Sequence, residues 1–245
     1  MCDDHRDLNL SSRRAFMQAL GAGAIGSVAL SAAAAAAPMP GMHLAPTTGV
    51  DLVKDPQIHK LRRPLIATGQ DILGPFWRAG APMTSSLAPK DAKGQRLQLS
   101  GTVRDTQGKP IEGVVLDFWN ADDTGLYDLT NPFQQLTPDA YKFRGLVKSD
   151  AAGKYAIETI VPGKYRIPPK LPGFEQFENL LRPAHVHLMT SHVASAPLIT
   201  QIYFKGDPEI AKDPFANKSR NVVTFDKTAE VWKSTFDIVL VRAGA

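Results

Sequence analysis

His185 and His187 are separated by one residue and form the densest chemical motif in the chain. On a β-strand, side chains two positions apart project to the same face, so the two imidazoles would lie on one side with their Cα atoms about 7 Å apart. Two imidazoles at this spacing can converge on one metal ion. The motif is short, and a pair of surface histidines explains it equally well.

Cysteines are excluded as further ligands of such a site. The single cysteine, Cys2, precedes a segment that is typical of an export signal and would be removed with it. The other donors would then be Asp, Glu, Tyr or water, and oxygen donors favour harder or higher-valent ions. Tyr127 and Tyr165 each follow a turn at the end of an expected strand. Taken singly, each tyrosine is more often a packed residue than a ligand.

The segments that carry these residues have the pattern of short strands. From Arg96 onward, runs of alternating apolar and polar residues are separated by turn residues, and the chain holds 19 glycines and 19 prolines. This pattern predicts an all-β fold, a two-sheet antiparallel β-sandwich. Strands are expected near residues 97–104, 114–119, 143–149, 154–160, 184–190, 198–204, 221–225 and 232–240.

The N-terminal residues are expected to lie outside this sandwich. Residues 1–37 carry Arg13 and Arg14 before an uncharged stretch rich in Ala and Gly, which is typical of a twin-arginine signal peptide. The alternative is an uncleaved anchor. Residues 38–73 lack periodicity and are expected to form a long irregular arm, followed by the sandwich over 74–245. We therefore expect a periplasmic or extracellular protein, carried by the twin-arginine translocase, with no stable membrane span after cleavage.

Composition excludes several classes of protein. Of the 245 residues, 43% are hydrophobic and 21% are charged, so the chain is globular and not disordered or fibrous. The net charge of +4 is too small and too dispersed for a nucleic-acid surface. A chain of this length can bury roughly 70% of its unfolded surface, so it builds a core without a structural metal. A bound metal would therefore serve chemistry.

The stretch from Gly74 to Pro208 resembles the intradiol ring-cleavage dioxygenases, which are non-haem iron(III) enzymes. The resemblance rests on motifs that occur in the family's order: Gly74-Pro75-Phe76, Gly101-Thr102-Val103, Asp117-Phe118-Trp119-Asn120-Ala121-Asp122, Gly125-Leu126-Tyr127, Pro162-Gly163-Lys164-Tyr165, Arg182-Pro183-Ala184-His185-Val186-His187 and Thr200-Gln201-Ile202-Tyr203-Phe204. An ordered set of motifs is far more specific than any one of them.

The resemblance implies the residues of the site. It assigns four ligands to Fe(III), with both tyrosines bound as phenolates: Tyr127, Tyr165, His185 and His187. It also makes Tyr165 a base that leaves the metal when a catechol binds. The substrate contacts that it implies are Phe76, Trp77, Arg182 and Gln201. Among these, Arg182 would stabilise negative charge that develops on the substrate, and Gln201 would line the same pocket.

The expected reaction converts a small aromatic diol and O2 into a muconate-type diacid without an external reductant. Protocatechuate is the leading expected substrate, with catechol or hydroxyquinol behind it. The residues before Arg96 are too few for the large helical N-terminal domain of the catechol-type members, and the positive net charge favours a carboxylated ring. Cations near the motifs that could pair with a carboxylate are Arg78, Lys164 and Arg166. Trp77, where many members carry Tyr, and the segment 166–181, interpreted as an insertion, leave the substrate open. Whether the chain assembles with identical or different subunits is also left open.

Two other classes of function remain at this point. A non-catalytic transthyretin-like sandwich would share Gly101-Thr102-Val103 but would leave the tyrosines and histidines unexplained. A zinc hydrolase would use His185 and His187 with a carboxylate near the pair, and its metal centre would be colourless.

Overall fold

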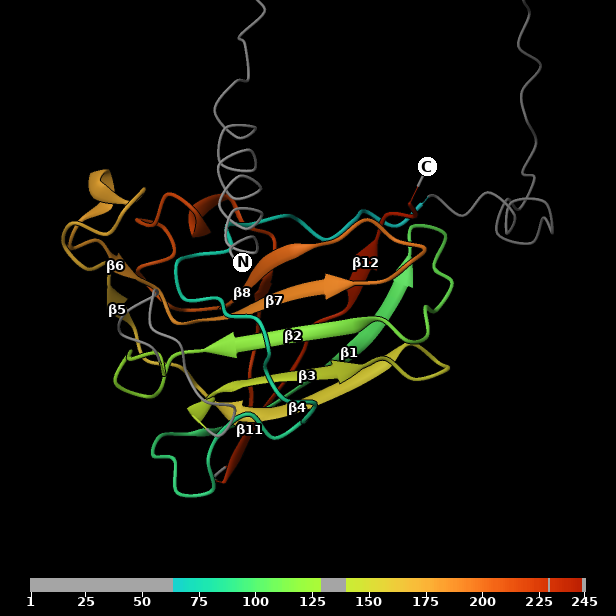
Figure 1. Cartoon of the computed structure of the whole chain (residues 1–245), viewed down its shortest axis with the longest axis horizontal. Helices are drawn as coiled ribbons and strands as arrows, with labels where there is room; N and C mark the ends of the chain where they lie inside the picture. The colour runs from blue at the N-terminus through green and yellow to red at the C-terminus, as the bar shows by residue number, and fades with distance from the viewer. Residues whose placement is uncertain (1–63, 129–139, 229, 244–245) are drawn as a thin grey trace, which may run out of the picture. The chain divides into compact units, whose positions relative to one another are not determined.

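The computed structural model describes residues 64–128, 140–228 and 230–243 (Figure 1). The signal predicted over 1–37 and the first part of the arm, up to residue 63, lie outside the described residues, so the signal and the domain boundaries stay predictions. Within the described residues, no helix is long and apolar enough to cross a membrane.

The described residues form two five-stranded sheets, which confirms the predicted all-β sandwich (Figure 1). The first sheet has the order β10 (Asp226–Lys227), β11 (Val231–Thr235), β1 (Arg96–Asp105) and β12 (Ile238–Leu240), and β4 (Lys154–Ile160) also pairs with β1. The second sheet has the order β3 (Arg144–Lys148), β2 (Val115–Asn120), β7 (His185–Ser191), β8 (Ile199–Phe204) and β9 (Val222–Val223). A separate pair consists of β5 (Tyr165–Arg166) and β6 (Leu181–Arg182).

Some strand pairs are parallel, which the antiparallel prediction did not include. β11 and β12 both run parallel to β1, and β9 runs parallel to β8. The expected strand 232–240 is divided into β11 and β12, which continue one ladder along β1. The division falls at Phe236, where the chain passes so close to Gly101 that a Cβ there would lie 2.0 Å from the Phe236 carbonyl oxygen.

The apolar core lies between the two sheets. Alternate residues of β2 and β7 point into it, among them Leu116, Phe118, Val186 and Leu188, each 0% exposed. Burying one such side chain contributes roughly 1.5–3 kcal/mol. Because alternate residues point into the core, the sequences of these strands are apolar at every second position.

The opposite face of the second sheet is also covered. Residues 64–88 cross it without helix or long strand, and backbone hydrogen bonds attach them to its strands (Figure 1). Asp71 N donates to Ile199 O at 2.8 Å, and Thr84 N donates to Leu146 O at 3.0 Å. The second sheet is therefore buried on both faces, and the face turned away from the core can hold a shielded polar site.

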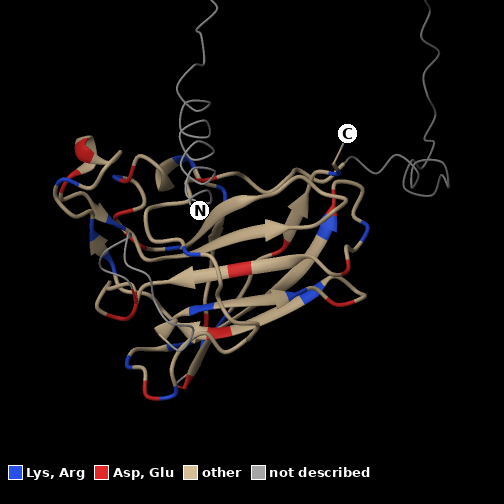
Figure 2. Ribbon diagram, in the orientation of Figure 1, with Lys and Arg blue, Asp and Glu red and all other residues tan. Residues whose placement is uncertain are grey.

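Lys, Arg, Asp and Glu are interspersed over the described residues, and Figure 2 shows no continuous basic stripe along them.

One acidic side chain lies on the covered face of the second sheet. Asp117 on β2 is 8% exposed and accepts a hydrogen bond of 2.9 Å from the indole of Trp77. Burial raises the pKa of Asp117 to about 6, although the Trp77 hydrogen bond and the charge of Arg144 lower it.

We expect Asp117→Asn to remove a pH-dependent loss of stability. The pKa of Asp117 is about 6 in the folded protein, against 3.8 for an ordinary aspartate. The folded state therefore binds more protons in this range, and the free energy of unfolding falls as the pH rises through it. This difference corresponds to roughly 3 kcal/mol. Asparagine keeps an acceptor for Trp77, so the variant should unfold at a higher temperature than the parent near neutral pH.

Thermal unfolding of both proteins over a pH series measures this effect. The advantage of the variant should shrink as the pH is lowered below the folded-state pKa. A difference in melting temperature that is the same at every pH would contradict it.

Candidate metal centre

Strand register brings five buried side chains together on the covered face of the second sheet. Trp119 pairs with His187, and His187 pairs with Gln201, while His185 pairs with Tyr203. None of the five is more than 2% exposed. This confirms that the two histidines share one face of a strand. A slip of one residue in β7 would turn both into the apolar core.

Two loops bring the tyrosines to the same place. Tyr127 follows β2, and Tyr165 begins β5. The loops touch at Gly125, where a Cβ would lie 2.2 Å from the Lys164 carbonyl oxygen. The backbone of Asp122 joins them as well, because its carbonyl accepts hydrogen bonds from the amides of both loops. The Tyr127 and Tyr165 rings consequently lie 5.5 Å apart at an angle of 86°.

Three polar atoms converge at the centre of this cluster. The hydroxyl of Tyr127 lies 3.1 Å from Nε2 of His187 and 3.4 Å from Nε2 of His185, and the two Nε2 atoms are 3.1 Å apart. Nδ1 of His185 lies 2.6 Å from the carbonyl oxygen of Pro183, which can only accept, so this nitrogen carries the proton. The Nε2 of His185 therefore offers a lone pair to the cluster.

Burial sets the protonation of these groups. It lowers the pKa of His185 to about 3, helped by the charge of Arg182, and lowers the pKa of His187 well below the usual value. Both imidazoles are therefore neutral, which is the form that binds metals. Burial raises the pKa of Tyr127 and of Tyr165, and for Tyr165 the charge of Arg182 opposes the increase. A multivalent cation between the rings would favour the phenolates and reverse this effect.

The donor set fits a hard metal ion. Ligand atoms about 2.1 Å from one ion lie roughly 3 Å from each other, which matches the separations within the cluster. Within the described residues, no group of three or more His, Cys, Asp or Glu could hold a metal ion. The oxygen donor beside the histidines is therefore a tyrosine and not a carboxylate, which disfavours the zinc hydrolase.

The imidazole of His187 is fixed from two sides. The Trp119 indole stacks on it at 4.7 Å and 8°. On the other side lies Gly74, with a φ of +73°, where an added Cβ would lie 3.1 Å from Cε1 of His187. The turn at Gly74 also delivers Phe76, which stacks on Tyr127 at 4.4 Å and 17°. The Gly-Pro-Phe motif thus positions one side of the candidate centre.

Arg182 and Gln201 lie against the same cluster. Arg182, on β6, pairs in register with Tyr165 and is 1% exposed. Its Nη2 donates to Oε1 of Gln201 at 2.9 Å, and its Nε donates to Asp213 at 2.5 Å. Sequence reasoning missed Asp213, which lies 31 positions from Arg182 and outside every motif. An isolated aspartate between strands carries no pattern that could have indicated this contact.

Apolar side chains surround the tyrosines. Phe76 and Trp77, for which the resemblance implies substrate contacts, pack there. Residues from 166–181 complete the cluster: Ile167, Leu171, Phe174, Phe177 and Leu180. Two of the cations considered for a substrate carboxylate have other partners. Lys164 pairs with Asp207 at 2.7 Å, and Arg166 donates to the carbonyl of Asn179 at 2.8 Å.

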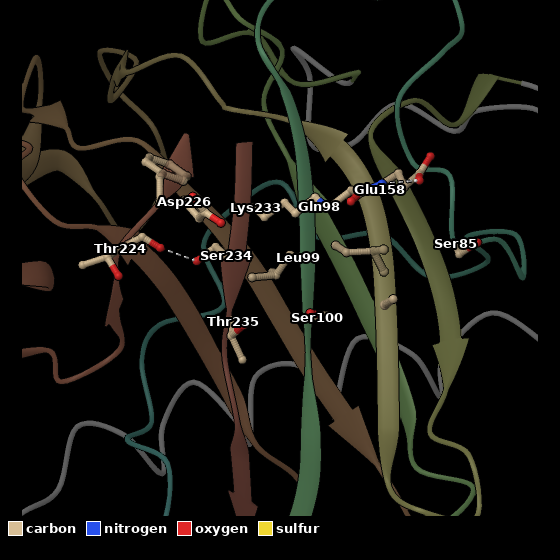
Figure 3. Close-up of a pocket in the computed structure, with 13 residues that line it drawn as sticks. Ser85, Gln98, Leu99, Ser100, Glu158, Thr224, Asp226, Lys233, Ser234 and Thr235 are labelled. Atoms are coloured by element: carbon tan, nitrogen blue, oxygen red, sulfur yellow. Dashed lines mark hydrogen bonds between the residues drawn. The ribbon is translucent and has the colours of Figure 1, made fainter. Parts of the chain in front are cut away.

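A hollow of about 820 Å³ lies on the outer face of the first sheet (Figure 3). Two of its polar side chains bond within the hollow: Gln98 donates to Glu158 at 3.0 Å, and Ser234 donates to the carbonyl of Thr224 at 2.9 Å. No residue that lines it belongs to the histidine and tyrosine cluster. The candidate metal centre therefore lies apart from this hollow.

Comparisons with known proteins find relatives that are dioxygenases. The profile of a family described as Dioxygenase matches residues 72–242. The chain is 35% identical over 180 residues to the chlorocatechol 1,2-dioxygenase of Rhodococcus opacus, covering 68% of this chain and 69% of that one. It is 34% identical over 169 residues to the catechol 1,2-dioxygenase of Acinetobacter baylyi, covering 65% of this chain and 53% of that one.

A solved structure gives the same result. The dioxygenase domain of a dioxygenase and carbohydrate-binding protein fusion from Streptomyces sp. SirexAA-E superposes with a TM-score of 0.59 at 31% identity, and the match covers 73% of this chain and 100% of that one.

We expect Gly74→Ala to weaken metal binding by displacing His187. Its matched control is Gly113→Ala, where φ is +75° and nothing lies within 4 Å of the added Cβ. A positive φ costs an alanine roughly 1–2 kcal/mol at both positions, so both variants should lose similar stability. Only Gly74→Ala should bind less metal, as measured by metal analysis of the purified proteins. Equal metal content in both variants would contradict this role of Gly74.

Proposed function

The chain belongs to the intradiol ring-cleavage dioxygenases, and from this membership we propose that it opens a catechol ring between the two hydroxyl-bearing carbons. Both atoms of O2 enter the product, a muconate-type diacid, so no external reductant is needed. The observation that carries the proposal is the convergence of a phenol oxygen and two imidazole nitrogens within 3.1 to 3.4 Å of each other. A transthyretin-like binding module would have no use for this cluster.

The metal of the proposal is non-haem iron, which the family uses, held as Fe(III) by Tyr127, Tyr165, His185 and His187. Two phenolates and a hydroxide would offset the three positive charges of Fe(III), so the net charge of the occupied site would be zero. When bound, the ferric ion supplies the chelation of the catecholate and the electron transfer that makes the ring reactive toward O2. The four side chains provide the hard oxygen donors and the neutral imidazoles that this ion requires.

Tyr165 and Arg182 have proposed roles in proton transfer and in charge stabilisation. Tyr165 is the proposed base for a catechol proton. Burial raises the pKa of both tyrosines and the charge of Arg182 opposes this for both, but Tyr165 is the one that also has a hydrogen bond with Arg182, which lowers its pKa further. Burial by itself lowers the pKa of Arg182, but Tyr165, Tyr203 and Asp213 outweigh it and raise that pKa. Arg182 therefore stays charged, and with Gln201 it would stabilise negative charge that develops on the ring.

The apolar walls around Tyr165 favour a ring without a charged substituent. Phe76, Ile167 and Leu171 are buried in this cluster. A carboxylated ring such as protocatechuate, the substrate expected from the sequence, needs a cation beside it, and Lys164 and Arg166 already have partners. The named relatives act on catechol and chlorocatechol. We therefore rank catechol and chlorinated catechols ahead of protocatechuate.

Oxygen uptake with a panel of diols tests the proposed function. The purified iron-loaded protein should be red-brown, because tyrosinates bound to Fe(III) absorb visible light. It should consume O2 with catechol, 4-chlorocatechol, hydroxyquinol or protocatechuate, with the highest kcat/KM for an uncharged ring, and mass spectrometry should identify a muconate-type product. A ring opened outside the two hydroxyls, or no uptake with any diol while iron is bound, refutes intradiol cleavage.

Ligand variants test the metal assignment separately. Tyr127→Phe and His187→Ala should lose the visible absorption and most of the iron. His192→Ala is the matched control, because His192 lies on the loop after β7 and its Nδ1 accepts only the amide of Ala194. Zinc in place of iron in the parent protein, or a full iron content in His187→Ala, would overturn the ligand set.

We also propose that the chain is exported by the twin-arginine route, on the strength of Arg13 and Arg14 before the uncharged stretch. Replacing both with lysine should leave the protein in the cytoplasm with its signal intact, whereas Arg6→Lys, which lies before the motif, should leave export unchanged. Cell fractionation measures this. Normal export of the double variant would favour the general secretory route.

A further inference from the structure

The guanidinium of Arg182 is held along two of its edges. Nε donates to Oδ2 of Asp213 at 2.5 Å. Nη2 donates to Oε1 of Gln201 at 2.9 Å and to the hydroxyl of Tyr203 at 3.3 Å. The ring of Phe215 lies 4.9 Å from Cζ. These contacts together restrict rotation of the guanidinium group about the bonds of its side chain.

Asp213 is itself rigid. It is 0% exposed, and its Oδ1 accepts the amides of Phe215 at 2.9 Å and Ala216 at 2.8 Å at the start of the 3₁₀ turn η4 (Ala216–Lys218). The two oxygens therefore have different tasks, since Oδ1 fixes the loop and Oδ2 receives Arg182. An Asp with one oxygen bound to backbone amides cannot follow a moving guanidinium.

The other edge of the guanidinium is fixed from the N-terminal side of the chain. Nε2 of Gln201 donates to the carbonyl of Ile72 at 2.8 Å, which leaves Oε1 as the acceptor that faces Arg182. The hydroxyl of Tyr203 lies 2.9 Å from Oδ2 of Asp71 and donates to it. Both partners of Nη2 are thus oriented by residues that cross the covered face of the sheet.

We propose that Asp213 is a positioning residue for the ring-opening reaction, which holds the guanidinium of Arg182 in the orientation that faces the substrate. The proposal rests on the proposed function. Asp213 does not touch the histidine and tyrosine cluster in any hydrogen bond that it makes. It acts through Arg182, whose charge stabilises the transition state only if the donors already point to where negative charge develops.

Asp213→Asn tests this role with few other changes. Asparagine keeps Oδ1 for the amides of Phe215 and Ala216 but turns an NH2 group toward Nε of Arg182, so that two donors face each other. We expect the iron content and the visible spectrum to remain, KM to change little, and kcat per bound iron to fall about 10- to 100-fold. Retention of the parent kcat per bound iron would overturn the proposal.

Asp105→Asn is the matched control. Asp105 has the same arrangement on a distant turn: Oδ1 accepts the amides of Gln107 and Lys109, each at 2.9 Å, and Oδ2 accepts Nε of Arg242 at 2.9 Å. This variant loses an arginine partner of the same kind without touching Arg182. It should lose stability and keep the parent kcat per bound iron. An equal loss of kcat in both variants would mean that Asp213 has only a structural role.

A double variant separates positioning from an independent effect. Because Asp213 acts through Arg182, Arg182→Ala with Asp213→Asn should have the same kcat per bound iron as Arg182→Ala alone. Losses that multiply would overturn the proposal. If Asp213→Asn does not fold, Asp213→Glu keeps the charge but moves the carboxylate by one methylene, and it should still lower kcat; a kcat equal to the parent's would again overturn positioning.

A crystal structure of Asp213→Asn provides a readout apart from activity. The Arg182 guanidinium should have turned away from its place beside Gln201, and an unchanged orientation would overturn the proposal. If the parent protein consumes no O2 with any diol, the proposed function fails by itself, and the crystal structure still reports whether Asp213 orients Arg182.

Discussion

The pairing of β2, β7 and β8 is the constraint on which the rest of the molecule depends. The register sets Trp119, His187 and Gln201 in one row across three strands, with His185 and Tyr203 in the next. The same alternation that sends Leu116 and Val186 into the apolar core sends the histidines to the other face. Core packing and site geometry therefore depend on the same strand register, because a shift of the register would disrupt both.

Burial on both faces of this sheet then explains the chemistry around the site. Polar groups that are removed from water need partners, and each charged group here has one, as with Arg144 and Asp128 or Arg182 and Asp213. The Nε2 atoms of His185 and His187 and the hydroxyl of Tyr127 are arranged differently, since they lie 3.1 to 3.4 Å from one another. The proposed cation would lie between them and bind their lone pairs.

Local periodicity made much of this predictable from the sequence. Period-two alternation indicated most strands and placed His185 and His187 on one face, and ordered motifs indicated the family. Contacts between distant residues were not predictable: no pattern connects Asp213 with Arg182, or Gly125 with Lys164. Two-residue strands such as β5 carry no periodicity. The division at Phe236 depends on a close approach to Gly101 that only the folded chain contains.

The candidate metal centre lies on the covered face of the second sheet. This position separates two kinds of sequence change. The proposed metal ligands belong in part to β7, whose other face builds the core. The walls that would contact the ring come from the 64–88 and 166–181 segments, which pack on the sandwich from outside. Substitutions in these segments can therefore alter the choice of substrate while the strands, and the proposed ligands that they carry, stay unchanged.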